Sequence, residues 1–420
     1  MTKGGYSLAM ALADRLTGWA AACLPRTNRS KRAAFLRGRR GWYATLEREL
    51  RLEPGRKTLW LHASSLGEFA IARPLIEELR SRHDCQFVIT FFSPSGYEAV
   101  KPDAERYENV FYLPWDTKRN VRAFLDRIRP DAALFMVSEY WHNFLGELCR
   151  RGVPTFLVSA LIRDDSVFFK WYGGDYRRDL QTFTQIFTLD DRSVENLARL
   201  GCTCAVRTGD PLFDNARAIA RRPYANPIIE RFKGGDRLFV AGSIGTDEDL
   251  TLIAALTAAY PGTKFLIVPH AVSEEEIGTV LGRLGSGAVR SSACTEETDF
   301  AGVQALVVDF VGALASLYRY GSWAYVGGGF TPFLHSVIEA VAYGLPVAFG
   351  PRVERKVTPQ QLMELGIGTK VASSRELCAW FGALQHDEAG LDRIRQACER
   401  YFEQNTGSTG TVARKIGEYL

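Results

Sequence analysis

The sequence predicts an α/β protein with two domains, each built around a parallel, doubly wound sheet. Apolar runs of strand length alternate with helical patterns from residue 57 to 207 and again from 238 to 349, and this alternation is typical of parallel sheets. A length of 420 residues fits two domains, and an apolar content of 46% is enough for two cores. A stretch rich in proline and glycine, residues 209–235, interrupts the rhythm and predicts the interdomain connection.

The clearest strand–turn–helix unit lies at residues 322–351. Residues 323–326 are an apolar strand, followed by the turn Gly327, Gly328 and Gly329 and then by a helical pattern from His335 to Tyr343. A glycine turn that leads into a helix N-terminus suits an anion, and Glu339 in that helix can accept hydrogen bonds from ribose hydroxyls. The alternative is an ordinary crossover whose glycines serve close packing.

Two carboxylates follow strands of the first half. The strand at residues 57–62 runs into a turn of small residues and then a helix from about Phe69 to Ser81, which places Glu68 at a helix N-terminus. That position should keep Glu68 ionised, so that it can act as a general base. Glu139 follows the strand at residues 132–137, at the edge where open α/β sheets place their sites. A helix-start glutamate without chemistry is the alternative for Glu68.

Strands of the second half end in candidate ligand-binding residues. The first strand turns at Ser243, another ends at Pro269 and His270, and a third ends at Asp309. Together with the glycine turn, these residues should face one crevice. A structural histidine remains the alternative for His270.

The N-terminal residues 6–24 are apolar but contain Asp14 and Arg15, so they are poorly suited to crossing a bilayer. An apolar helix beside a basic cluster is typical of a membrane-surface anchor. The alternative is a helix packed on the first domain. The cations that follow the helix are Arg26, Arg29, Lys31, Arg32, Arg37, Arg39 and Arg40.

The composition argues against a nucleic-acid-binding protein and against a zinc protein. The net charge of +4 is mild and indicates no nucleic-acid partner. The cysteines are scattered, and Cys202 and Cys204 lack a second pair, so a zinc site is not expected.

These motifs together resemble the 3-deoxy-D-manno-octulosonic acid (Kdo) transferases of lipid A assembly, in a form most similar to the Bacteroidetes branch. The resemblance covers nearly the whole chain, through the order and spacing of several short motifs. They are residues 62–68 (HASSLGE), 138–143 (SEYWHN), 159–163 (SALIR), 209–214 (GDPLFD), 269–270 (PH), 309–312 (DFVG), 327–329 (GGG) and 335–339 (HSVIE).

The resemblance implies a GT-B fold with an interdomain cleft, and inverting transfer of Kdo from CMP-Kdo to a lipid A precursor. It implies Glu68 as general base and Glu139 as a second essential carboxylate, with Ser65, Gly67 and Arg163 on the acceptor side. No metal or cofactor is implied, and the expected location is the cytoplasmic face of the inner membrane, peripheral or monotopic. The implied donor-binding residues are Ser243, Pro269, His270, Val311, Gly312, Ala313, Gly327, Gly328, Gly329, His335, Ser336, Val337, Ile338 and Glu339.

The expected domains are an anchor and basic arm at 1–40, an acceptor domain at 41–208, a linker at 209–235, a donor domain at 236–400 and a helix at 401–420 that can cross back. Three residues depart from the family pattern: Leu212 and Ala313 replace a cation and a glutamate, and Ser336 replaces an asparagine. The alternatives are another GT-B transferase or epimerase, or a weakly catalytic relative that binds a CMP-sugar or lipid.

Overall fold

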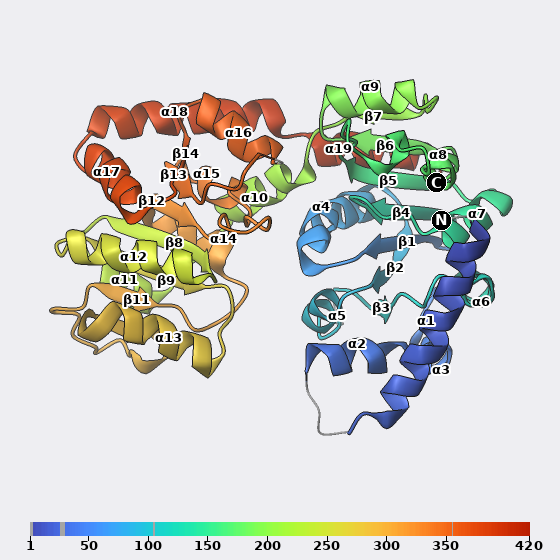
Figure 1. Ribbon diagram of the computed structural model, residues 1–420, viewed down its shortest axis with the longest axis horizontal. Helices are drawn as coiled ribbons and strands as arrows, with labels where there is room; N and C mark the ends of the chain where they lie inside the picture. Colours follow the sequence, from blue (N-terminus) through green and yellow to red (C-terminus); the bar gives the residue numbers. More distant parts are fainter. Residues whose placement is uncertain (1–2, 26–29, 104–105, 355) are drawn as a thin grey trace. The chain divides into compact units, whose positions relative to one another are not determined.

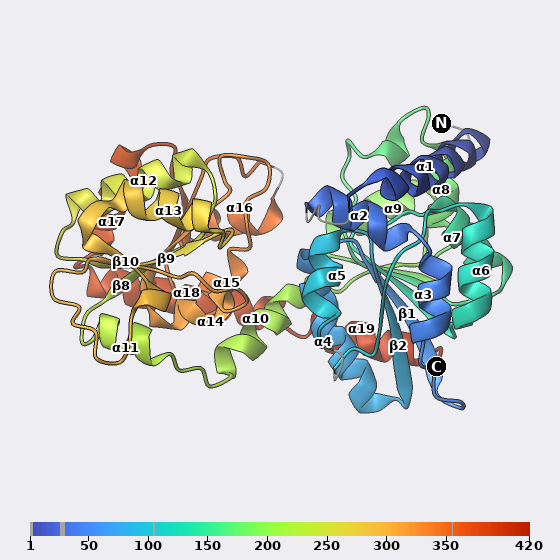
Figure 2. The same ribbon diagram turned by 90° about the horizontal axis from the view of Figure 1, so that it is seen from below.

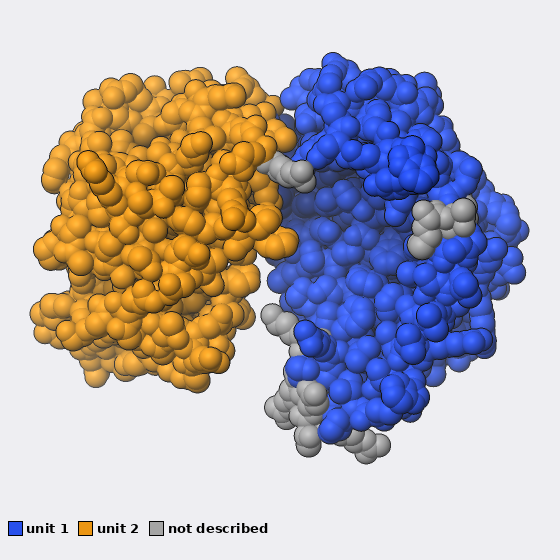
Figure 3. All heavy atoms as spheres, viewed as in Figure 1, with its two compact units in different colours: residues 1–215, 405–420 blue, residues 216–404 orange. Residues whose placement is uncertain are grey.

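The computed structural model describes residues 3–25, 30–103, 106–354 and 356–420 and divides them into two compact units. Unit 1 comprises residues 1–215 and 405–420, and unit 2 comprises residues 216–404 (Figure 3). Each unit holds a seven-stranded sheet whose strand pairs are all parallel. The predicted α/β class is therefore confirmed.

The sheet of unit 1 has the strand order β3-β2-β1-β4-β5-β6-β7. Its order reverses between β1 and β4, and open α/β sheets bind ligands at such a switch point. The strands are β1 (Lys57–Ala63), β2 (Cys85–Phe91), β3 (Asn109–Tyr112), β4 (Ala132–Met136), β5 (Thr155–Ala160), β6 (Gln185–Thr188) and β7 (Ala205–Arg207).

Apolar side chains cover both faces of this sheet, as expected for a parallel sheet between helices. Figure 1 shows the helices that pack on it. One face is covered by α4 (Leu66–Arg82), α5 (Pro94–Val100) and α19 (Ser408–Gly417). The other is covered by α3 (Trp42–Glu49), α6 (Lys118–Ile128), α7 (His142–Arg150), α8 (Gly174–Leu180) and α9 (Asp191–Arg199). Two N-terminal helices, α1 (Lys3–Cys23) and α2 (Lys31–Arg39), complete the unit.

The sheet of unit 2 has the order β10-β11-β9-β8-β12-β13-β14, with its switch point between β8 and β12. Figure 2 shows α12 (Asp247–Ala259), α13 (Glu274–Leu284) and α17 (Ser374–Leu384) on one face and α11 (Pro227–Lys233) and α14 (Leu314–Leu317) on the other. The strands are β8 (Leu238–Ile244), β9 (Lys264–Pro269), β10 (Ala288–Arg290), β11 (Ala305–Val307), β12 (Gly321–Val326), β13 (Val347–Phe349) and β14 (Gly368–Lys370).

Two expected elements differ in the structure. The helix expected from His335 to Tyr343 is only α15 (Ile338–Val341), because the His335 N–H donates to the Gly327 carbonyl at 3.2 Å and holds this stretch in a turn. The stretch expected as a linker, 209–235, contains α10 (Pro211–Arg221) and α11. Pro211 and Pro227 are the first residues of these helices, where a missing N–H is harmless.

The chain end returns to unit 1. The Asp214 carboxylate accepts the N–H groups of Gly407 and Thr409, each at 2.7 Å, and α19 packs on α4. Leu212, at a position where a cation was expected from the resemblance, packs on the same apolar cluster. The remaining helices of unit 2 are α16 (Val357–Glu364) and α18 (Glu388–Asn405).

Candidate active site

In unit 1, Glu68 lies in the first turn of α4, directly after β1. It forms a capping box with Ser65: the Glu68 N–H donates to Ser65 Oγ at 3.4 Å, and the Ser65 N–H donates to Glu68 Oε2 at 3.2 Å. The Ser64 N–H donates to the same oxygen. Among the described residues, no group hydrogen-bonds to Glu68 Oε1, so this oxygen is available to a substrate. Gly67 beside it is exposed.

Glu139 follows β4, the neighbour of β1, and is held by three side chains. Ser64 Oγ donates to its Oε1 and Trp141 Nε1 to its Oε2, both at 2.5 Å. His62 Nε2 lies 3.5 Å from Oε2. These donors outweigh burial and lower the pKa of Glu139. Ser64 thus contacts both carboxylates, one through its backbone and the other through its hydroxyl.

His62 is fully buried, and its other ring nitrogen is already committed. Nδ1 lies 3.1 Å from the Thr90 carbonyl oxygen, which can only accept, so Nδ1 carries hydrogen. A hydrogen bond between Nε2 and Glu139 therefore requires a proton on one of the two groups. At 3.5 Å from Glu139 Oε2, the buried His62 Nε2 makes no hydrogen bond among the described residues.

The pKa of Glu68 is raised to about 7, first by burial and then by the charge of Glu139; hydrogen bonds from Ser64 and Ser65 offset only part of this. The expectation that the helix N-terminus keeps this carboxylate firmly ionised is therefore wrong. Desolvation and a like charge outweigh the helix dipole. A carboxylate with a pKa near neutrality is well matched to general base catalysis.

Arg163 lies in the turn after β5, and its N–H donates to Ser166 Oγ at 2.9 Å. The strand ends beside it have unusual backbone conformations: Val137 has φ +67° and Ser159 has φ +61°. Left-handed backbone at such residues is uncommon and concentrates at functional sites. In unit 2, Ser243 at the end of β8 has φ +54°, so both sheets show this feature at their carboxyl edge.

In unit 2, the two predicted histidines meet at the carboxyl edge of the sheet. The ring centroids of His270 and His335 are 4.5 Å apart. Burial, and then the charge of His270, lower the pKa of His335. A Cβ added to Gly245 would lie 3.0 Å from His270 Cβ, so the first turn after β8 passes close beside this pair.

Glu339 is a half-buried carboxylate whose pKa is raised to about 7 by desolvation. Among the described residues, no hydrogen bond or ion pair satisfies it. Tyr318 lies near it, with a buried hydroxyl that also has no partner. An uncompensated, desolvated carboxylate needs donors, and the hydroxyl groups of a ligand can supply them.

The glycine turn serves packing more than the sequence indicated. A Cβ on Gly327 would meet the Ser243 carbonyl oxygen at 2.2 Å, and one on Gly329 would meet the Gly350 nitrogen at 2.5 Å. The Gly328 N–H donates to Asp249 Oδ2 at 3.0 Å and is therefore not available to an anion. Asp249, on α12, was not anticipated because its partner is distant in sequence.

The other predicted donor residues differ in accessibility. Pro269, Val337 and Ile338 are buried, Ser336 is half-buried, and Val311 and Gly312 are exposed after β11. Ala313 is the N-cap residue of α14. Asp309 is held by Ser291, Ser292 and Arg290 and links β10 to β11.

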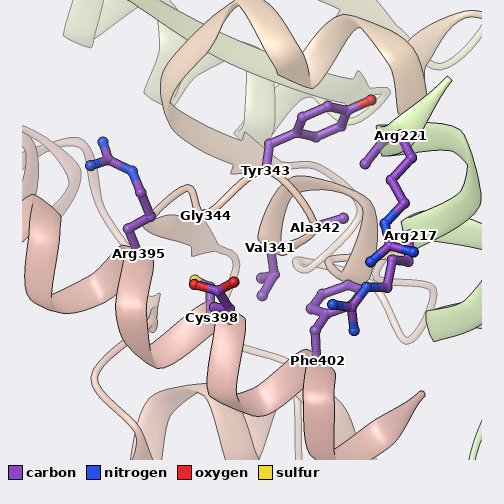
Figure 4. A pocket seen from close by; sticks show the side chains of 11 residues that line it. Arg217, Arg221, Val341, Ala342, Tyr343, Gly344, Arg395, Cys398 and Phe402 are labelled. Carbon is purple, nitrogen blue, oxygen red and sulfur yellow. The ribbon is translucent and has the colours of Figure 1, made fainter. Parts of the chain in front are cut away.

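A separate cavity of about 360 Å³ lies elsewhere in unit 2, between α10, α15 and α18. Figure 4 shows Arg217 and Arg221 on one side and Arg395 on the other, with Val341 and Phe402 between them. None of the predicted donor-binding residues lines it.

Within the described part of the chain, no helix is long and apolar enough to span a membrane. Among the same residues, no group of three or more His, Cys, Asp or Glu side chains is arranged to hold a metal ion.

A family model described as 3-deoxy-D-manno-octulosonic-acid transferase (kdotransferase) matches residues 35–215. Proteins named 3-deoxy-D-manno-octulosonic acid transferase are similar over most of the chain. That of Chlamydia trachomatis is 26% identical over 82% of this chain and 84% of its own. That of Aquifex aeolicus is 27% identical over 76% of this chain and 83% of its own.

Solved structures agree on the fold. UDP-GlcNAc 2-epimerase from Neisseria meningitidis matches with a TM-score of 0.59 at 13% identity, over 87% of this chain and 99% of that one. MurG from Acinetobacter baumannii matches with a TM-score of 0.51 at 11% identity, over 86% and 99%. The GT-B class, with two Rossmann-like domains, is thereby confirmed.

Proposed function

The chain belongs to the Kdo transferases, and from that premise we propose that it transfers Kdo from CMP-Kdo to a glucosamine hydroxyl of a lipid A precursor, with inversion at the anomeric carbon. The observation that carries this proposal is Glu68: a carboxylate at the sheet's switch point, with a pKa near 7 and one oxygen open to substrate. Such a group can take a proton from a sugar hydroxyl.

In the proposed step, the acceptor oxygen attacks the anomeric carbon of Kdo while Glu68 Oε1 removes its proton. The bond between that carbon and the CMP phosphate oxygen breaks, and CMP leaves with the electron pair. Glu139 does not take the proton, because each of its oxygens already accepts a hydrogen bond, one from Ser64 and the other from Trp141. Its charge instead keeps Glu68 basic.

On the donor side, we propose that Glu339 accepts hydrogen bonds from the ribose hydroxyls of CMP. The support is that Glu339 is half-buried, is desolvated and has no hydrogen-bond partner among the described residues. The loop at 311–312 and Ala313 follow β11, and Ser336 follows the turn at 327–329 after β12. That turn shapes the edge of the sheet by letting backbone segments approach closely.

The deciding experiment is an assay with CMP-Kdo and a tetraacylated lipid A precursor. We expect transfer by the wild type and a loss of about 10²–10⁴-fold in turnover for Glu68→Gln, the range typical of a lost general base. CMP binding should be unchanged in that variant. Binding of CMP-Kdo without transfer would favour a non-catalytic role, and activity with another sugar nucleotide alone would favour another GT-B enzyme.

We also propose that the protein lies on the cytoplasmic face of the inner membrane through α1. One face of this helix carries exposed apolar side chains, with 55–72% of each exposed, at the helical spacing expected for a lipid-facing stripe. They are Leu8, Leu12, Leu16 and Trp19.

The basic arm is smaller than the sequence indicated. Arg39 is buried among the rings of Phe35, Phe92, Tyr112 and Trp115, and burial lowers its pKa to about 10, so it cannot meet lipid head groups. Arg32 and Arg40 are exposed, and Arg37 donates to the Pro25 carbonyl at 2.5 Å. Arg26 and Arg29 lie outside the described residues.

A further inference from the structure

The first turns of α1 are hydrogen-bonded to the inside of unit 1. Tyr6 Oη donates to Asp116 Oδ2 at 2.9 Å, and Ser7 Oγ donates to Asn143 Oδ1 at 3.1 Å. The Tyr6 ring also meets the His142 ring edge-on, with centroids 4.4 Å apart. Asp116 follows β3, whereas His142 and Asn143 begin α7, so α1 joins two separate segments of the domain.

Asp116 is fully buried and caps α7. Its Oδ1 accepts the Phe144 N–H and its Oδ2 accepts the Asn143 N–H, both at 3.0 Å. The residue at the N-cap position of α7, Trp141, supplies no side-chain cap of its own. The cap therefore comes from a remote carboxylate, which shares one oxygen between α7 and Tyr6.

This cap lies next to the candidate active site. Trp141, immediately before α7, donates its indole N–H to Glu139 Oε2 at 2.5 Å. A continuous chain of contacts thus runs from the Tyr6 hydroxyl through Asp116 to the start of α7, and from Trp141 to Glu139. Every contact lies within unit 1.

We propose that Tyr6 and Asp116 are positioning residues for Glu139, so that docking of α1 on unit 1 aligns the catalytic carboxylates. This inference rests on the proposed function. It gives α1 a second role: one face carries the apolar stripe proposed to meet lipid, and the first turns hold the start of α7.

The energetics of Asp116 make the Tyr6 hydroxyl important. Burial raises the pKa of Asp116 to about 6, although the N–H groups of Asn143 and Phe144 and the hydroxyl of Tyr6 act against this rise. A buried carboxylate depends on every donor it has. Without the Tyr6 hydroxyl, Asp116 keeps only its α7 contacts, and the cap can shift.

The primary test is Tyr6→Phe, which removes the hydroxyl but keeps the ring against His142. We expect turnover with detergent-dispersed acceptor to fall by about 3- to 10-fold, the effect of one lost hydrogen bond. KM for CMP-Kdo should not change. Flotation on liposomes should also be unchanged, because the apolar stripe is intact, and this separates positioning from membrane binding.

The matched control is Asp14→Ala. Asp14 lies on the same helix, and its Oδ2 accepts from Asn120 Nδ2 at 3.1 Å, but Asn120 belongs to α6 and also donates to the Trp115 carbonyl. This variant removes a hydrogen bond between α1 and unit 1 that reaches the backbone before Asp116 but leaves every donor to the Asp116 carboxylate in place. It should turn over at the wild-type rate. An equal loss in both variants would mean that general docking of α1 matters and that the route through Asp116 is wrong.

A double-mutant cycle tests the route itself. Trp141→Phe removes the indole donor to Glu139, so if Tyr6 acts through the start of α7, Tyr6→Phe should add little to the loss that Trp141→Phe causes. If the turnover losses of the two single variants multiply in the double variant, the two residues act independently and the proposal is overturned. So would Tyr6→Phe with wild-type turnover, provided that the wild type transfers Kdo. A wild type without transfer would instead overturn the proposed function.

Discussion

The pKa of Glu68 depends on the charge of Glu139. Because the nearby charge of Glu139 raises the pKa of Glu68, removing that charge should lower it. We expect the Glu68 carboxyl carbon, followed by NMR, to titrate near pH 7 in the wild type and at distinctly lower pH in Glu139→Gln. NMR serves even if that variant is inactive. Glu147→Gln, on α7, is a control that should leave the titration in place; an unshifted titration in Glu139→Gln would contradict the coupling.

Burial of Glu68 also predicts that Glu68→Gln, which should lose activity, is relatively more stable at high pH. A carboxyl whose folded pKa is raised, here from 4.5 to about 7, contributes stability below the lower value and loses it as pH rises through the higher one. Glutamine cannot ionise, and its side-chain oxygen can still accept from Ser64 and Ser65. We therefore expect the thermal midpoint of Glu68→Gln, relative to that of the wild type, to rise as the pH is raised from 5 to 8. A constant difference across that range would show that the ionised carboxylate is not destabilised.

Residue identities were more predictable than residue environments. Glu68 and Glu139 could be selected because each follows an apolar strand, and strand ends can be read from sequence. The raised pKa of Glu68 could not be predicted, because it depends on Glu139, which Ser64 contacts across 75 positions of the sequence. Asp249 was missed for the same reason, since its bond to Gly328 spans 79 positions. His62 and Ser64 lie in the HASSLGE segment, so their place near the site had a signal, although their partners did not.

At the scale of elements, membrane binding by α1 is tested better by point substitutions than by deletion of the helix. Removing residues 1–40 would also remove Tyr6 and the buried Arg39, so a truncated chain would lose internal contacts as well as the apolar face. Leu12→Gln with Leu16→Gln changes only the exposed stripe.

We expect flotation on anionic liposomes to fall at least about tenfold in this double variant, because burial of each leucine is worth about 1.5–3 kcal/mol. Thermal stability should stay near that of the wild type. Leu365→Gln, which replaces a half-exposed leucine of unit 2, is the matched control and should float normally. Unchanged flotation of the double variant would mean that another surface binds lipid.

Elements were predicted best where burial alone decides them. All strands of the first sheet and five of the second lie at apolar runs that predict them, whereas the short edge strands β10 and β14 were not predicted. Helix length near the site was not predictable, because the His335 N–H bonds to the Gly327 carbonyl and α15 begins only at Ile338. The division between the units lies within residues 209–235, as predicted, but the helices α10 and α11 were not predicted there, because proline and glycine mark helix starts and ends as well as linkers.

For the whole molecule, the two units divide the proposed reaction, with the base in unit 1 and the nucleotide in unit 2. Hydrogen exchange with and without CMP tests this division. We expect protection at residues 243–245, 311–313 and 327–339, because these segments lie at or after the carboxyl ends of β8, β11 and β12, and no change around Glu68 or Glu139. Glu339→Ala should abolish the protection, because ribose hydroxyls would lose a desolvated acceptor worth about 1.5–3 kcal/mol. Glu399→Ala, in the cavity of Figure 4, should retain it. Protection at residues 217–221 and 395–402 instead would place the nucleotide in that cavity and overturn the assignment of Glu339.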